Sequence, residues 1–307
     1  MKPLQELTTP QPELALTLCD ASLLERLSRV PAPYTLSELM AALGWREPPL
    51  PVGQRPLSRL YFGNEFCERL LPRSSQVAQA VRWCRERGVP LTLLTPMLAD
   101  KGIGQLPTLL QQLPGDSEVV VNDWGVLRLV RERFPRLRPV AGRQMCKMIK
   151  DPRLPSSEWA QAIPPGSQSS LFPRLMQRFG IGAVETDLRP FAENEDLQPN
   201  GLGLSVHFPY GYTLKGRICK PGSLGLEKRR KFTPGHSCQR ECLDYFSRMQ
   251  RTGYQSPHEL PGFQRGNTIF YRYGETQEQV LSHALEQGWV GRLVLAGDWN
   301  EHRCTDQ

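Results

Sequence analysis

No stretch of this 307-residue chain approaches the roughly 18 uninterrupted apolar residues that a membrane span requires. Residues 1–18 contain the acidic Glu6 and Glu13 and no apolar core, so they do not resemble a secretory signal. We therefore expect a soluble protein of the cytoplasm. In that compartment its eight cysteines stay reduced and available as ligands.

Sequence signatures of several enzyme classes are also missing. The chain has no Gly-x-Ser-x-Gly elbow of a serine hydrolase and no His-Glu-x-x-His motif of a zinc peptidase. The first predicted strand is not followed by a Gly-rich phosphate loop, and the pair Gly102-x-Gly104 alone is too weak to indicate a nucleotide site. If the protein is a peptidase, its sequence does not reveal the nucleophile.

The composition, 39% apolar and 22% charged, is that of a soluble globular protein. The net charge is +7 and the pI about 9.1. The densest basic run consists of Lys228, Arg229, Arg230 and Lys231. A solvated loop is the ordinary role of such a run, and contact with RNA is the alternative.

Helical and extended patterns alternate along most of the chain. Residues 1–55 contain two helix-like segments, 12–27 and 36–43, and we expect them to form an N-terminal extension that packs on the main domain. Beyond residue 56, apolar runs predict strands at 57–63, 90–95, 118–123, 138–142, 182–186, 203–207, 214–218, 268–273 and 292–296. Helices are predicted at 74–88, 106–113, 125–134, 171–179 and 276–287.

This alternation predicts an α/β fold with a parallel sheet. About eight strand–helix units indicate a closed (β/α)8 TIM-type barrel over residues 56–307, of regular or irregular form. A doubly wound open sheet is the alternative.

Polar side chains gather where the predicted strands end. In a barrel the chemistry lies at the C-terminal ends of the strands. Asp123, Glu185, Asp187 and His207 are therefore candidate acids, bases or substrate partners at the barrel mouth. An equally simple role for Asp123 is to cap a helix or shape a turn.

Three cysteines form the most restrictive pattern in the chain. Cys219, Cys238 and Cys242 are spaced C-x18-C-x3-C, among Lys, Arg, Gly, Pro and Ser rather than apolar residues. Such surroundings favour thiolate ligands of a metal or cluster over core thiols. The last two are predicted to begin a helix that continues through Met249, which would place both sulfurs on one face. Packing of three small apolar side chains is the alternative.

A fourth ligand is expected from Cys67. It follows the first predicted barrel strand, while Cys219 ends a late one, and closure of a barrel brings first and last strands together. Alternatively, His236 completes a Cys3His zinc site with Cys219, Cys238 and Cys242, and Cys67 stays free. Cys146 follows the fourth predicted strand, and Cys19, Cys84 and Cys304 are expected to be structural.

Several short motifs resemble the collagenase-like peptidase family (peptidase U32 type), and within it the UbiV branch of the UbiU and UbiV proteins. Together they span about residues 57–273, most of the chain. The motifs are Tyr61–Cys67, Val121–Gly125, Pro139–Gly142, His207–Tyr210 and the three later cysteines.

The resemblance implies an iron–sulfur protein. UbiU and UbiV each hold a [4Fe-4S] cluster on four cysteines, and the pair supports oxygen-independent hydroxylation in ubiquinone synthesis. Other relatives are needed for hydroxylation of RNA bases. Matched by motif, Cys67, Cys219, Cys238 and Cys242 would be the ligands. A second, UbiU-like family member would be the partner, and the chain would be one component of a hydroxylase.

Overall fold

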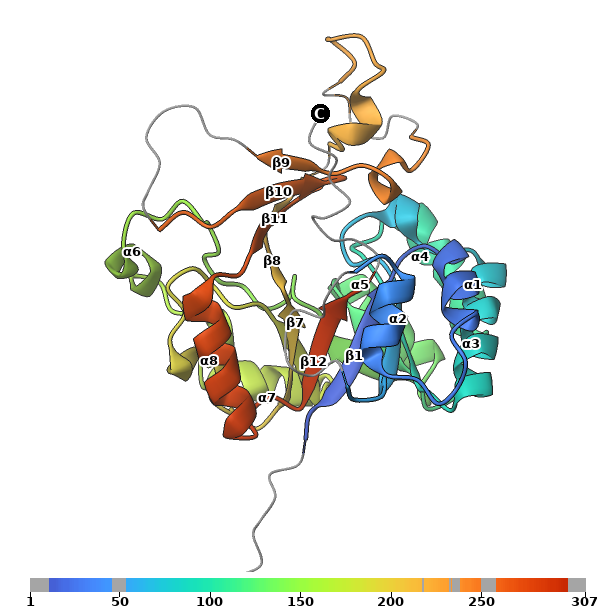
Figure 1. Ribbon diagram of the computed structural model, residues 1–307, viewed down its shortest axis with the longest axis horizontal. Coiled ribbons are helices and arrows are strands. Elements are labelled where there is room, and N and C mark those ends of the chain that lie inside the picture. Colours follow the sequence, from blue (N-terminus) through green and yellow to red (C-terminus); the bar gives the residue numbers. More distant parts are fainter. Residues whose placement is uncertain are drawn as a thin grey trace, which may run out of the picture.

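The computed structural model describes residues 11–45, 54–216, 218–231, 233, 238–249 and 258–297. Eight parallel strands close into a barrel, in the order β1-β12-β7-β6-β5-β4-β3-β2 (Figure 1). They are β1 (Glu13–Leu18), β2 (Arg59–Gly63), β3 (Leu91–Leu94), β4 (Glu118–Val121), β5 (Arg138–Ala141), β6 (Ala183–Thr186), β7 (Gly203–Phe208) and β12 (Arg292–Ala296). The predicted α/β barrel is confirmed.

Helices follow most of the strands and surround the barrel. They are α1 (Ser22–Ser28), α2 (Leu36–Ala42), α3 (Ser74–Arg87), α4 (Asp100–Leu110), α5 (Trp124–Arg133), α6 (Ser157–Gln161), α7 (Leu171–Arg178) and α8 (Glu275–Glu286). Short 3-10 turns are η1 (Glu68–Leu70), η2 (Gly166–Gln168), η3 (Asn194–Leu197), η4 (Pro221–Ser223) and η5 (Glu241–Leu243). In the described ranges, no helix has the length and apolar character needed to cross a membrane.

The N-terminal segment corrects the sequence prediction. The predicted helix over 12–27 is a strand, β1, followed by the helix α1. Leu14, Leu16 and Leu18 alternate with other residues, which is the period of a strand, and Leu16 pairs with both Leu60 and Leu295. β1 thus lies between β12 and β2 and closes the barrel. The barrel begins at Glu13, before the predicted boundary at residue 56, and the expected extension supplies one of its strands.

Inward-facing side chains form layers inside the barrel, because alternate residues of each strand point to its interior. A small apolar layer fills the middle: Ala15, Tyr61, Leu94, Val120, Val140 and Val294. Two residues earlier on the strands lies a polar layer, which includes Glu13, Arg59, Thr92, Glu118 and Arg292. There the Nη1 atom of Arg292 lies 2.8 Å from the Glu118 carboxylate. Two residues later, the strands reach the barrel mouth.

A second sheet lies beyond the C-terminal ends of the barrel strands (Figure 1). It is antiparallel, in the order β8-β11-β10-β9, and we call it the cap sheet: β8 (Tyr210–Lys215), β9 (Ser247–Met249), β10 (Gly262–Arg265) and β11 (Thr268–Arg272). The segments 214–218 and 268–273 were predicted as barrel strands, and this is wrong. Only Pro209 separates β7 from β8, whereas a parallel crossover needs about a dozen residues or more.

The helix expected to begin at Cys238 and run through Met249 is also absent from the described residues of that segment. Glu241–Leu243 forms the 3-10 turn η5, and Ser247–Met249 is the strand β9, with Met249 opposite Gly262 of β10. Pairing with a neighbouring strand outweighs the local helical spacing of Leu243, Phe246 and Met249.

Candidate functional site

The four predicted cysteine ligands line one pocket. It is an open pocket of about 680 Å³ where the barrel mouth meets the cap sheet, and we call it the cysteine pocket. Cys67 enters from the barrel side, and Cys219, Cys238 and Cys242 enter from the segments that join the cap strands. Residues more than 170 positions apart in the sequence therefore meet at one site.

The route by which they meet differs from the prediction. Cys219 does not end a barrel strand, because β8 belongs to the cap sheet, and Cys67 follows β2 rather than the first strand. The cap sheet folds over the mouth and brings its cysteines to Cys67. Asn267 ties the two parts together, since its side-chain amide donates to the Phe66 carbonyl at 3.1 Å and the Gly216 carbonyl at 3.0 Å.

Cys67 lies in a tightly defined loop after β2. Gly63 has a φ of +120°, and a Cβ there would lie 2.5 Å from the Leu94 carbonyl oxygen, so only glycine fits. The Asn64 side chain then accepts the backbone N–H groups of Phe66 at 2.9 Å and Cys67 at 2.8 Å. Burial raises the pKa of the Cys67 thiol, and backbone N–H groups of η1 that donate to it partly offset this. Such N–H donors stabilise a thiolate.

Glycine residues bring the backbone close to the other three cysteines. Cys219 accepts the Gly222 N–H at a distance of 3.4 Å. A Cβ at Gly222 would lie 3.0 Å from the Cys238 Cβ and 3.3 Å from the Cys219 sulfur, so a side chain there would crowd both. Cys242 is buried in η5, and a Cβ at Gly266 would lie 3.4 Å from its sulfur. Side chains at Gly222 and Gly266 would occupy the space around the thiols.

The thiols influence one another's ionisation. Burial raises the pKa of Cys242 to about 12, Arg265 lowers it, and negative charge on Cys219, Cys67 or Cys238 raises it further. Burial also raises the pKa of Cys219, with contributions from Cys67 and Cys238. Thiols with raised pKa values are protonated at neutral pH, and binding of a metal to such thiols requires the release of their protons.

The spacing of the sulfurs argues against a preformed zinc site. Thiolates on one zinc ion, at about 2.3 Å each, lie about 3.8 Å from one another. Among the described residues, the only group of three or more candidate ligands whose donor atoms all lie within 4.8 Å of each other is Glu65, Glu185 and His207. A cluster of several metal atoms holds its ligands further apart than one ion does. His236, the alternative zinc ligand, and Cys304 lie outside the described residues.

A second pocket, the mouth pocket, adjoins the cysteine pocket and shares Cys67 and Cys242 with it. Glu65 and Arg143 line it, and further buried charges lie behind them. The Arg143 guanidinium donates to Glu65 at 2.5 Å and to Asp187 at 2.7 Å. Lys150 donates to the other oxygen of Asp187 at 2.7 Å. Burial alone would raise the pKa of Asp187, but the charges of Arg143 and Lys150 lower it to about 2. This carboxylate is therefore ionised at neutral pH.

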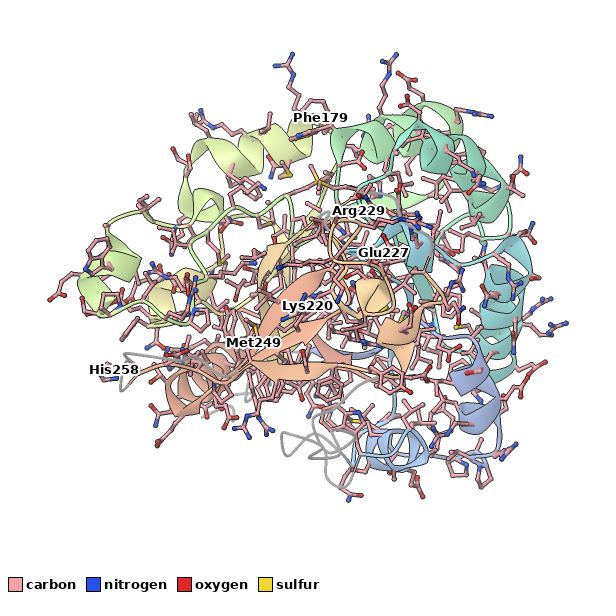
Figure 2. All side chains as sticks on the ribbon, turned by 90° about the horizontal axis from the view of Figure 1, so that it is seen from above. Phe179, Lys220, Glu227, Arg229, Met249 and His258 are labelled. Atoms are coloured by element: carbon pink, nitrogen blue, oxygen red, sulfur yellow. The ribbon has the colours of Figure 1, made fainter. Side chains whose placement is uncertain are left out.

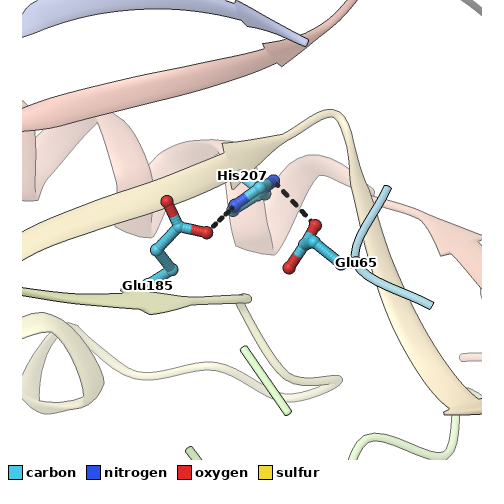
Figure 3. Close-up of side chains that lie close together, drawn as sticks. All are labelled: Glu65, Glu185 and His207. Carbon is cyan, nitrogen blue, oxygen red and sulfur yellow. Dashed lines mark hydrogen bonds and ion pairs between the residues drawn. The ribbon is translucent and has the colours of Figure 1, made fainter. Parts of the chain in front are cut away.

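His207 and Glu185 form a buried pair in this network (Figure 3). The Nε2 atom of His207 lies 2.9 Å from the Glu185 carboxylate, and its Nδ1 lies 4.0 Å from Glu65. Burial lowers the pKa of His207 to about 3, and the charge of Arg143 adds to this effect, so the imidazole is neutral. Burial raises the pKa of Glu185 to about 7. A carboxyl that titrates near neutral pH beside a neutral imidazole is suited to proton transfer.

The other predicted catalytic residue, Asp123, lies apart from this pair. One of its carboxylate oxygens accepts the Val126 N–H at 2.8 Å and caps α5, and the other accepts the Leu98 N–H at 3.0 Å. Both oxygens are thus engaged by the backbone, which favours the capping role.

Sequence reasoning assigned no role to several residues at the mouth. Glu65 and Arg143 were visible as strand-end residues, but their pairing across the barrel was not. Lys150 lies in an irregular stretch with no signal. Cys19 lines the mouth pocket because it follows β1, which was mistaken for a helix. Cys146 is fully buried, burial raises its pKa to about 12, and it lines neither pocket.

The basic run lies on the segment between β8 and β9, and Figure 2 labels its Arg229 together with Glu227. Lys228, Arg229 and Arg230 are exposed and Lys231 is half-buried. Arg229 pairs with Glu227 at 3.3 Å, and both side chains remain largely in solvent. An exposed pair of this kind contributes little to stability.

Comparison with known proteins gives distant likenesses. No family model matches the sequence, and no curated protein matches it. Among solved structures, the U32 peptidase Mk0906 is similar at a TM-score of 0.45 and 11% identity, over 97% of each chain. The C-terminal domain of a putative chitinase from Desulfitobacterium hafniense DCB-2 reaches 0.41 and 10%, over 95% of this chain and 96% of that one. The Bacillus megaterium QM B1551 spore cortex-lytic enzyme SleL reaches 0.37 and 9%, over 96% and 72%. One barrel architecture can serve many reactions, so the site itself must indicate the function.

Proposed function

We propose that this chain is an iron–sulfur barrel protein that supports oxygen-independent hydroxylation. Cys67, Cys219, Cys238 and Cys242 would hold one [4Fe-4S] cluster in the cysteine pocket. The observation that carries the proposal is the convergence of these four thiols on one pocket beside the barrel mouth. The backbone N–H groups that donate to Cys67 and Cys219 are the kind of contact that tunes such a cluster.

The cluster and the residues of the mouth pocket would have separate roles in the reaction. When bound, the cluster supplies one-electron chemistry at the edge of the mouth pocket. Cys67 and Cys242 line both pockets, so a small group that enters the mouth pocket, whose volume is about 70 Å³, would lie beside the cluster. His207 lines the mouth and can exchange a proton with Glu185 behind it. The Arg143 pairs with Glu65 and Asp187 fix the buried charges beside the mouth pocket.

Purified without oxygen, the protein is expected to be brown and to contain about four irons and four sulfides per chain, because a cubane cluster uses four thiolates. Iron and sulfide analysis with a visible spectrum measures this. Colourless protein with one zinc and no sulfide would overturn the cluster in favour of the Cys3His alternative with His236.

The acceptor of the hydroxyl group has two candidates. The resemblance to UbiV favours a quinone precursor. The exposed basic residues Lys228, Arg229 and Arg230 favour an RNA base. Comparing quinone intermediates and modified nucleosides in a deletion strain grown without oxygen decides between them, since only one of the two profiles should change.

We also propose that the chain works with a second, UbiU-like family member. Exposed apolar side chains gather where α5 begins and α7 ends: the Trp124 and Phe179 rings lie 5.2 Å apart, and Leu171 and Leu175 of α7 precede Phe179 at intervals of four residues, which places them on one helix face. Clustered exposed apolar groups are typical of an interface. We expect the purified chain alone to show no hydroxylation, and Phe179→Asp to weaken recovery of the co-expressed partner in a pull-down. Full activity of an isolated monomer would contradict the partner, and Glu132→Lys on an exposed side of α5 is the control.

A further inference from the structure

A group of three buried side chains at the barrel mouth has the composition of a metal site. Glu65 comes from the loop after β2, Glu185 from β6 and His207 from β7, so three separate elements bring them together (Figure 3). A donor atom from each lies within 4.8 Å of the other two. Their side chains are 3%, 0% and 6% exposed, respectively.

One carboxylate oxygen of Glu185 has no close hydrogen-bond partner. The Oε2 atom of Glu185 lies 2.9 Å from His207, whereas its buried Oε1 has no partner within 3.5 Å among the described residues, although the nearby Tyr61 hydroxyl lowers the pKa of this carboxyl. Buried polar atoms in folded proteins are nearly always paired, so an orphaned carboxylate oxygen calls for an explanation.

The balance of charge around this group favours a bound cation. Glu65, Glu185 and Asp187 contribute three carboxylates, whereas Arg143 and Lys150 contribute two positive charges. Counted as ions, these five buried groups carry three negative charges and two positive ones, so one further positive charge would balance them. Arg143 holds Glu65 in place, and a carboxylate oxygen so held still has a lone pair for a further ligand.

We propose that Glu65, Glu185 and His207 bind one divalent transition-metal ion, such as Mn²⁺ or Fe²⁺. Two carboxylates and one imidazole suit these ions rather than the thiolate-preferring ones. Glu65 and His207 line the mouth pocket, so an ion held by them would lie beside that pocket. The site does not share a ligand with the cysteine pocket and does not depend on a cluster being bound.

Manganese is the probe for this site, because it favours oxygen and nitrogen donors over thiolates. The full-length protein is titrated with Mn²⁺ without oxygen, and the loss of the free-ion EPR signal reports binding. We expect one Mn²⁺ per chain, both in the wild-type protein and in Cys238→Ser. Glu185→Gln should weaken binding roughly tenfold or more, as expected when a ligand is removed. Asp123→Asn, which changes a carboxylate outside the group and retains the helix cap, should bind as the wild type does.

A second ligand variant keeps the test decisive if Glu185→Gln fails to fold. His207→Gln, checked by circular dichroism, should lose Mn²⁺ binding to the same degree. The proposal is overturned if the folded wild-type protein shows no binding below about 1 mM, a dissociation constant of only weak association. It is also overturned if the ligand variants and Asp123→Asn bind alike. Iron and sulfide content is measured on the same samples, so failure of this site is distinguished from failure of the cluster.

Discussion

Replacing Cys67 by alanine is expected to remove most of the iron from the anaerobically purified protein, about as severely as Cys238→Ala. Both sulfurs line the cysteine pocket, although they belong to different parts of the fold. The other described cysteines, Cys19, Cys84 and Cys146, do not line the cysteine pocket. Three thiolates then leave the cluster one ligand short. Iron, sulfide and the visible spectrum per chain measure the loss.

The matched control is Cys84→Ala. Cys84 is a buried thiol of α3 that packs in the core between the barrel and its helices. Its replacement should leave the iron content near that of the wild type, even where it lowers stability. If Cys67→Ala retained its iron and an unchanged spectrum, another group would complete the site, with Cys146 and His236 tested next. The assignment of the cysteine pocket as a four-thiolate site would then be wrong.

Arg143→Met is expected to lower the free energy of unfolding by about 3–5 kcal/mol, the cost of leaving buried charges without their partner. Arg143 is 5% exposed and holds two carboxylates, Glu65 and Asp187, that are buried at least as deeply. Methionine retains much of the side-chain volume, so the loss reports the charge rather than a cavity. Lys150 remains on Asp187, and the uncompensated group is mainly Glu65.

Urea unfolding followed by circular dichroism measures this difference. The control is Arg128→Met, which removes an exposed ion pair with Glu132 on one face of α5. That change should lower the free energy of unfolding by only about 0.3–0.5 kcal/mol. A loss below about 1 kcal/mol in Arg143→Met would mean that water replaces the guanidinium and reaches the buried charges.

The sequence was sufficient for most of the barrel because its strands are short apolar runs bounded by Gly, Pro and polar residues. Predicted strands at 90–95, 118–123 and 292–296 coincide with β3, β4 and β12. β1 was missed because Leu14, Leu16 and Leu18 precede Leu23, Leu24 and Leu27, and the combined run imitates one helical stripe. Local pattern also could not separate cap strands from barrel strands, since both present the same alternation.

The sequence predicted which residues belong to the site better than it predicted how they are arranged. The strand-end rule placed Cys67, Glu185 and His207 on one face of the barrel, and the structure has them there. The role of Arg143 as a bridge between Glu65 and Asp187 could not be predicted, since it depends on residues more than 40 positions away in either direction. The approach of Cys219 to Cys67 depends on how the cap sheet folds over the mouth, and no residue in either segment encodes this on its own.

The division of the four cysteines between barrel and cap sheet has a consequence for exposure to air. A cluster bound by Cys67 and by Cys219, Cys238 and Cys242 would cross-link the cap sheet to the barrel. The cross-link would close a loop of about 150 residues and so reduce the conformational entropy of the unfolded chain. Oxygen that destroys the cluster would remove this cross-link, and direct contacts would then hold the cap sheet to the barrel, among them those of Asn267 with the Phe66 carbonyl and of the Tyr212 hydroxyl with the Arg143 carbonyl. Exposure to air would therefore lower the stability of the folded protein while these contacts remain.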